Sequence, residues 1–245
     1  TRSREAASLS SWMRPMKATI RPSAGSPSYS TSSPTGGVST KAEWSPLVNV
    51  AYTRGRFSAS LGGLNYNVVQ SDVFTLGVGA AYSPKRKAAD DVRLRGMGDV
   101  EASPTILLTA GWNPLDFVNV YATYTGATKR ANGNILTIGT TVGFPLFGKL
   151  NGFVDLSADI ADRKHAQTYY GVTAAQSVTS RYSVFTPRAG VVKTAVSVGL
   201  NYELSEQWSL GATVGRETLA GDAAKSPIFL RRNEPTGSVF ASYTF

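Results

Sequence analysis

Cysteine, histidine and long apolar runs are scarce in this sequence, and each scarcity narrows its range of functions. The 245 residues include no cysteine, which excludes disulfides and thiolate metal sites. The single histidine, His165, leaves little scope for histidine-dependent catalysis or metal binding. No apolar run reaches about 18 residues, so the sequence predicts no transmembrane helix. A chain of this kind could cross a membrane only with β-strands.

Side chains instead alternate with a period of two over most of the chain. One row is apolar, and the other carries Gly, Ser, Thr, Asn and Asp. The segments run roughly 9–11 residues, as tilted strands in a bilayer do, whereas soluble strands centre on about 5–6. Aromatic residues gather at segment ends, as in interfacial girdles. The predicted segments are 48–53, 57–62, 74–82, 105–112, 118–125, 136–144, 150–160, 192–202, 208–215 and 238–245.

The connections alternate between short and long. Short turns are predicted at 67–73, 113–116, 145–149 and 203–206, and long loops at 83–104, 126–134, 162–190 and 220–235. Short periplasmic turns and long extracellular loops are typical of a transmembrane antiparallel up-and-down β-barrel, so an all-β fold of this type is expected. Bacterial barrels have even strand numbers. With a possible first strand at 16–24, the predicted strands number about eleven. A further strand near 36–44 would give twelve, with ten as the alternative.

The two ends of the chain carry separate expectations. Residues 1–12 are polar without a clear period and are interpreted as a flexible leader, with the barrel spanning 13–245. The turn at 54–56 is expected on the extracellular side. The last strand ends on Tyr243 and Phe245, which resembles the signal that the barrel assembly machinery reads in outer-membrane proteins.

Charge differs between the two predicted sides. The net charge is +9, and the four long loops hold fourteen Lys/Arg against seven Asp/Glu. Such loops would attract the phosphates of lipopolysaccharide in the outer-membrane lipid. The turns are acidic, and Asp116, Glu203 and Glu206 are candidates for docking a periplasmic or lipoprotein partner. No basic stretch is interleaved with aromatics, so nucleic acid is not an expected partner.

The few charged strand residues suggest a polar lumen rather than an active site. Asp155 and Asp159 share one row but lie about 13 Å apart, too far to share a proton or one metal ion. They are expected to form a lumen network with Lys193 and Glu217. The loop 162–190 is the candidate plug, with four aromatic residues to bury: Tyr169, Tyr170, Tyr182 and Phe185.

No enzyme or cofactor is predicted. His165 lies beside Arg163 and Lys164, which makes it a poor general base, and it is interpreted as a solvated loop residue.

Several motifs resemble one family. The run from Gln167 to Ser177 (QTYYGVTAAQS) is similar to the long-loop motif of the MipA/OmpV outer-membrane family, and YELSEQWSL at 202–210 and GDAAKSPI at 221–228 continue the resemblance. The segment LRGMGDV at 94–100 adds to it, whereas Lys225 replaces a residue that is usually acidic. The resemblance implies a non-enzymatic scaffold that links the outer membrane to murein-related partners, the family being named for interaction with the murein transglycosylase MltA.

Two other functions stay open at this stage. A small passive pore for hydrophilic solutes would be lined by Asp155, Asp159 and Lys193. A soluble β-sandwich binder would need to fold and stay monodisperse without detergent.

Overall fold

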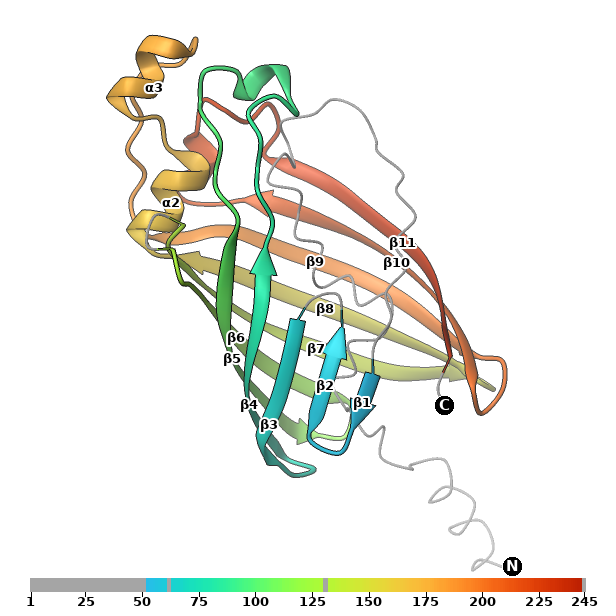
Figure 1. Ribbon diagram of the computed structural model, residues 1–245. Coiled ribbons are helices and arrows are strands. Elements are labelled where there is room, and N and C mark those ends of the chain that lie inside the picture. Colours follow the sequence, from blue (N-terminus) through green and yellow to red (C-terminus); the bar gives the residue numbers. More distant parts are fainter. Residues whose placement is uncertain (1–51, 61–62, 130–131, 244–245) are drawn as a thin grey trace, which may run out of the picture.

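The fold is a single antiparallel meander, seen in a computed structural model that describes residues 52–60, 63–129 and 132–243 (Figure 1). Eleven strands pair in sequence order. They are β1 (Tyr52–Arg54), β2 (Phe57–Ser60), β3 (Gly63–Gln70), β4 (Phe74–Ser83), β5 (Ser103–Leu115), β6 (Val118–Ala127), β7 (Asn134–Phe147), β8 (Leu150–Ala161), β9 (Gly190–Glu203), β10 (Trp208–Leu219) and β11 (Asn233–Tyr243). The strand predicted near 36–44 lies outside the described residues.

The two faces of the sheet have the polarity that the alternation predicts. On β9 and β10 the outward row is apolar and exposed, so that Val198 is 45% exposed. The inward row is small or hydroxylated, and Thr213 is only 5% exposed. A soluble sandwich does the reverse, because it buries its large apolar side chains. The apolar exterior therefore needs an apolar medium around it.

Several strands extend beyond their predicted ends. β5 continues to Leu115 and β7 to Phe147, so the turns predicted at 113–116 and 145–149 begin too early. Both strands pass through register shifts there, at Trp112/Leu115 and at Pro145/Phe147. Proline removes one ladder hydrogen bond, and a bulge accommodates that loss without ending the strand.

β3 is the strand that the sequence analysis missed, since a turn was predicted at 67–73. Leu64, Tyr66 and Val68 do alternate with polar neighbours, but the segment is separated from β2 only by a very short connection. The extra strand also changes the end of the sheet at which the preceding turn lies. The turn at 54–56 lies at the same end as the β3–β4 turn, where Asn67 donates to the carbonyl of Arg56 at 2.8 Å, so its predicted placement with the long loops is wrong.

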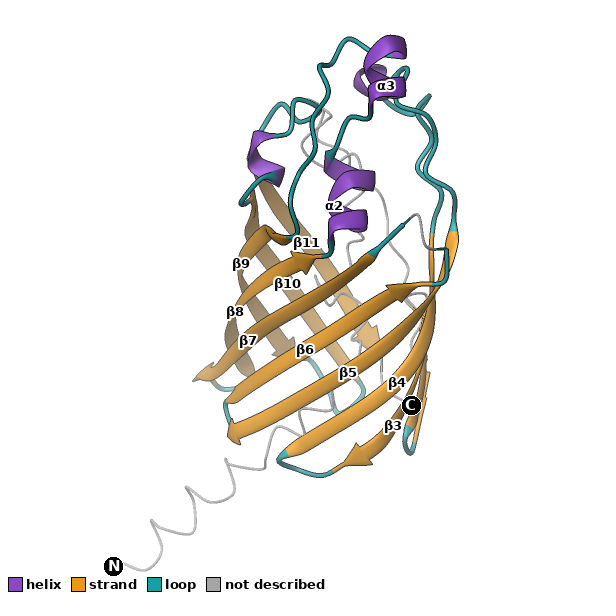
Figure 2. Ribbon diagram, turned by 90° about the vertical axis from the view of Figure 1, so that its left-hand side faces the viewer, coloured by secondary structure: helices purple, strands orange, loops and turns teal. Residues whose placement is uncertain are grey.

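The long connections gather at one end of the sheet and are partly helical (Figures 1 and 2). They contain α2 (Arg163–Tyr170), α3 (Ala174–Thr179) and two short 3-10 turns, η2 (Val92–Leu94) and η3 (Ala223–Lys225). Only loops were predicted here. Asp162 caps α2, and a capping box formed by Thr173 and Gln176 starts α3. None of the described helices has the length and apolar character needed to span a membrane.

Candidate functional site

A buried ion triad lies on the inner face near the long-loop end. Lys193 Nζ on β9 is 3.2 Å from Asp159 Oδ2 on β8 and 3.2 Å from Glu217 Oε1 on β10. The three side chains are only 15–18% exposed. Pairing puts Asp159 directly opposite Lys193, and Thr137 Oγ1 also donates to Asp159 at 2.7 Å. The charges thus satisfy one another across three adjacent strands.

Asp155 does not belong to this triad. Its carboxylate accepts from Tyr121 Oη at 3.2 Å and from Thr141 Oγ1 at 2.7 Å. Two pleats separate it from Asp159, about 13 Å along the strand. The four residues expected in one network therefore form two clusters. Within the part of the chain that the structure describes, no three His, Cys, Asp or Glu residues gather closely enough to hold a metal ion.

A β-bulge next to the triad reorients one residue of the predicted apolar row. Register shifts between Asp159 and Ile160, so that Lys193 pairs with Asp159 while Val191 pairs with Ile160. Val192 is the extra residue, and it is 2% exposed rather than outward-facing, which corrects the prediction. It packs with Ala161, Ala166 and Ala223, and this cluster seats α2 on the ends of the strands.

The last residue of α2 lies above the triad. Tyr170 packs in part against the same cluster, and its ring centroid is 5.4 Å from that of Phe229. Burial, together with the nearby carboxylates of Asp159 and Glu217, raises the pKa of Tyr170 well above its usual value. Ser226 Oγ donates to the carbonyl of Tyr170 at 2.7 Å, which fixes this end of the helix. The helix therefore lies over the charged inner rim of β8–β10.

Three of the long loops, 84–102, 162–189 and 220–232, fold into one unit that we call the cap. Its apolar core contains Leu94, Met97, Val172, Tyr182 and Ile228, which come from all three loops. Buried Arg86 donates to the carbonyls of Thr168 at 3.3 Å and Tyr169 at 3.4 Å. These are carbonyls of the last turn of α2, where a cation is favourable. The loops are thus a packed structure in their own right.

The four aromatic residues of the proposed plug have different surroundings. Tyr170 alone among them lies near the triad. Tyr169 stacks under Arg86, with the guanidinium carbon 5.5 Å from the ring centroid. Tyr182 is in the cap core, and Phe185 exchanges backbone hydrogen bonds with Val172. Most of the loop's aromatic surface therefore holds the cap together.

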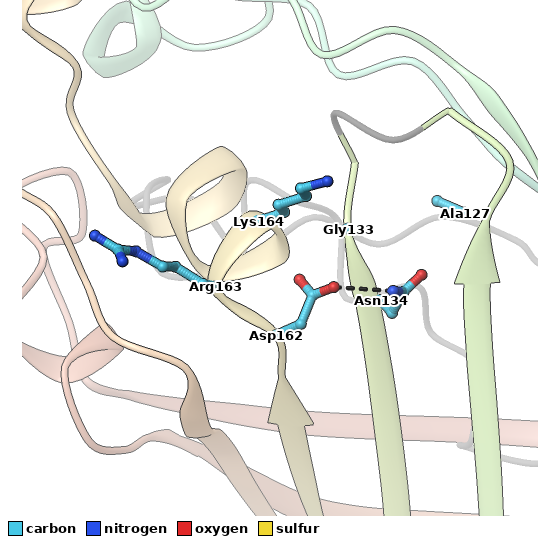
Figure 3. A pocket seen from close by; sticks show the side chains of 6 residues that line it. All are labelled: Ala127, Gly133, Asn134, Asp162, Arg163 and Lys164. Carbon is cyan, nitrogen blue, oxygen red and sulfur yellow. Dashed lines mark hydrogen bonds between the residues drawn. The ribbon is translucent and has the colours of Figure 1, made fainter.

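His165 lies in the first turn of α2. Its neighbours Arg163 and Lys164 line a pocket of about 320 Å³ (Figure 3). Asp162 lines this pocket, accepting from Asn134 Nδ2 at 2.9 Å and from the His165 amide at 2.7 Å. The His165 ring is stacked on Tyr169, with centroids 4.4 Å apart. Burial lowers the pKa of His165 to about 4. The residue is therefore a desolvated, neutral part of the packing, and its interpretation as a solvated loop histidine is wrong.

The residues predicted for docking and assembly lie at the opposite end. Asp116, Glu203 and Glu206 are exposed at the β5–β6 and β9–β10 turns. The turn at 54–56 brings the exposed Arg56 to the same end, so this face is mixed rather than acidic. Tyr243 pairs with Trp208 at the end of β11, and Phe245 lies outside the described residues.

Long antiparallel strands, an apolar exterior and a polar interior that holds the paired charges Asp159, Lys193 and Glu217 define a membrane β-sheet protein of the outer-membrane type. The sequence comparison agrees: the pattern described as "MltA-interacting protein MipA" matches residues 24–245. The chain belongs to the MipA family and, with that family, to the bacterial outer membrane.

The comparisons with solved structures and with curated proteins add little to this family assignment. The fold is similar to that of the outer-membrane expressed OmpT of Vibrio cholerae, with a TM-score of 0.38 and 10% sequence identity. The similarity covers 80% of this chain and 64% of that one, so the chain spans less than two thirds of that protein. No curated protein matches the chain.

Within the cap, the packing of α3 against the 84–102 loop can be tested with two glycines of that loop. Gly96 and Gly98 both have positive φ (82° and 73°), but only at Gly96 would a Cβ overlap the carbonyl of Thr179. Gly98→Ala should cost about 1 kcal/mol of strain. Gly96→Ala carries the same strain plus the clash, and it should expose the cap to limited proteolysis about tenfold faster than Gly98→Ala. Equal rates for the two variants would show that this contact does not hold the cap.

A second prediction concerns pH. His165 is neutral in the folded protein down to about pH 4, whereas the unfolded chain takes up a proton below about 6.5. The cap should therefore lose about 3 kcal/mol of stability as pH falls from 6.5 to 4, and none above 6.5. Hydrogen exchange of α2 amides measures this, with the non-titrating His165→Gln variant as reference at each pH. The same pH response in both proteins would contradict the assignment.

Proposed function

We propose that this protein is a closed, capped and non-enzymatic β-barrel that acts as a scaffold between the outer membrane and a periplasmic, murein-related partner. The observation that carries the proposal is α2 lying over the Asp159–Lys193–Glu217 triad, held there by the cap. A passive pore needs a clear path past its charged lining. A packed cap over that lining instead favours a sealed barrel that functions by binding partners at its surfaces.

Closure of the barrel is itself part of the proposal. Eleven antiparallel strands in sequence order leave β1 and β11 running in the same direction. Direct pairing of these two would be parallel, whereas bacterial barrels close with antiparallel strands and even numbers. One further strand before β1 restores the parity and gives twelve. The strand predicted near 36–44, outside the described residues, would supply it.

The orientation follows from the connections. Outer-membrane barrels have short periplasmic turns and longer extracellular loops, which puts the cap outside the cell and the turns at Asp116 and Glu206 in the periplasm. The family is described as MltA-interacting, and a murein transglycosylase of that kind would meet the turns. The partner would then contact a mixed face, which carries these carboxylates and Arg56 at the same end of the sheet.

The sealed lumen can be tested by single-channel conductance in a planar bilayer. The intact protein should give no steady conductance, and a variant lacking residues 163–189 should conduct, because α2 and two of the five core residues of the cap are gone. Heat-modifiable gel mobility must show that both proteins are folded. Steady conductance in the intact protein would favour the passive-pore alternative, with Asp155, Asp159 and Lys193 lining the path. Silence in a folded deletion variant would mean that something other than the cap seals the barrel.

The docking face can be tested by charge reversal. Asp116→Lys, Glu203→Lys and Glu206→Lys together should weaken binding of a soluble murein transglycosylase of the MltA type by more than about tenfold, if two or more ion pairs are lost. The single variants Glu206→Lys and Asp90→Lys form a matched pair, since both residues are exposed but lie at opposite ends. Only Glu206→Lys should weaken binding. Unchanged binding in the triple variant would reject docking at these turns.

A further inference from the structure

One charged residue departs from the polarity of the sheet. In the described strands from β3 to β11, Arg216 is the single charged side chain on the outward-facing apolar row. Its neighbours along that row of β10 are Ala212 and Val214, and across the sheet it lies opposite Val196 and Pro235. A cation on a lipid-facing surface is costly at the middle of a bilayer, by about 2–4 kcal/mol, and costs about 0–1 near the interface.

The depth of Arg216 agrees with an interfacial position. Trp208 begins β10 at the short-turn end, and eight residues separate it from Arg216, or roughly 26 Å along the strand. Tilting by about 40° reduces this to roughly 20 Å across a membrane whose apolar band is about 25 Å. Arg216 therefore lies at the upper margin of the band, close to the headgroups of the leaflet that faces the cap.

Two more arginines lie just above this position. Arg231 and Arg232 are exposed and directly precede β11, and the amide of Leu219 donates to the carbonyl of Arg232 at 2.7 Å. None of the three arginines forms an ion pair with any residue that the structure describes. Elsewhere in the cap, Lys85 and Arg188 pair with carboxylates, whereas Arg95, Arg163 and Lys164 form no ion pair with a described residue.

The surface below the arginines is apolar and shallow. Val214 is 67% exposed and Val239 80%, whereas Val196 and Val198 on β9 are 42% and 45% exposed. Small neighbours explain part of the difference, because Val214 lies opposite Gly237 and Val239 lies opposite Ala212. Val239 is also on β11, the last strand of the described sheet, where no further described strand covers it. An unbranched chain can lie on such a surface, below the level of Arg216, Arg231 and Arg232.

We propose that Arg216, Arg231 and Arg232, with Val214 and Val239 below them, form a binding site for a phosphorylated glycolipid of the outer leaflet, that is, lipopolysaccharide through its lipid A moiety. Arginine binds phosphate oxygens through paired, charge-assisted hydrogen bonds. The acyl chains would cover the valines while a phosphate neutralises the guanidinium groups. The proposal rests on the orientation given above, since only the outer leaflet supplies this lipid.

Contact of the Arg216 side chain with water alone is a weaker explanation for its position on the apolar row. A long side chain can extend to reach solvent, which would account for one cation at the rim. It does not account for three unpaired arginines on adjacent segments above the exposed Val214 and Val239. A phosphate and an acyl chain attached to one molecule match both parts of this surface at once.

Binding of bis-phosphorylated lipid A to the full-length protein, refolded in detergent and followed by native mass spectrometry, tests the site. Arg216→Gln should raise the dissociation constant about tenfold, as expected for loss of one charge-assisted contact. Arg216→Lys should restore part of the affinity. Arg95→Gln is the matched control, because Arg95 is an exposed cap arginine of equal charge on the β4–β5 connection rather than on β10 or β11. The affinity of this variant should change less than about twofold.

Each other outcome counts against the site. Unchanged affinity in Arg216→Gln, or an equal loss of affinity in Arg95→Gln, would show that lipid A binds through the overall charge of the protein and not at this site. Equal binding of lipid A stripped of its phosphates would reject phosphate recognition, and equal competition by phosphatidylglycerol would show a general preference for anionic lipid. Heat-modifiable mobility confirms that each variant is folded. Transglycosylase binding should be the same for Arg216→Gln and the parent protein, so failure of this site and failure of the scaffold proposal are separate results.

Discussion

The backbone's need for hydrogen bonds in an apolar medium is the constraint on which this structure depends. A strand in hydrocarbon has no water to bind its amides and carbonyls, so each strand needs a partner on both sides. From β2 to β10 the meander supplies both partners, and consecutive strands pair with continuous registers broken by few bulges. The same constraint makes β1 and β11 the most informative strands of the sheet, because each has one edge that pairs with no other described strand. Their directions decide how the proposed barrel could close.

The interior obeys a second rule, which is that charges out of bulk water need partners. Lys193 lies between two carboxylates, and Asp155 has two hydroxyl donors instead of a cation. The bulge at Val192 joins this polar interior to the cap, since it turns one apolar side chain inward exactly where α2 needs a surface. Triad, bulge and helix are therefore one arrangement, and the proposed sealing of the barrel depends on all three.

Local pattern was enough to predict much of this architecture. A period of two over β4 to β11, with polar residues on one row, identified both the strand class and the inward position of Asp159, Lys193 and Glu217. The predictions that failed concern features that the alternation of side chains does not reveal. β3 was missed because the residues joining it to β2 are so few, and Val192 was misplaced because a bulge has no signature in alternation.

The cap could be predicted less well than the sheet. The capping box at Thr173 and Gln176 is a recognisable helix start, and it could have revealed α3. The burial of His165 could not be seen in its neighbours, because Arg163 and Lys164 suggest solvent while the ring packs on Tyr169 one turn later. Contacts between loops that are distant in sequence decide that environment.

Those distant contacts have a consequence for the order of folding. Every hairpin of the sheet joins neighbours in sequence, whereas Arg86 reaches residues 82 and 83 positions away and Arg93 bonds a carbonyl 135 positions away. Loop-closure entropy makes contacts of such separation late events. The cap can form only when β4 to β11 have already brought their ends together. Protection of cap amides from hydrogen exchange is thus a kinetic marker for the last stage of assembly. A partner that recognised the cap would recognise only chains that had completed this assembly.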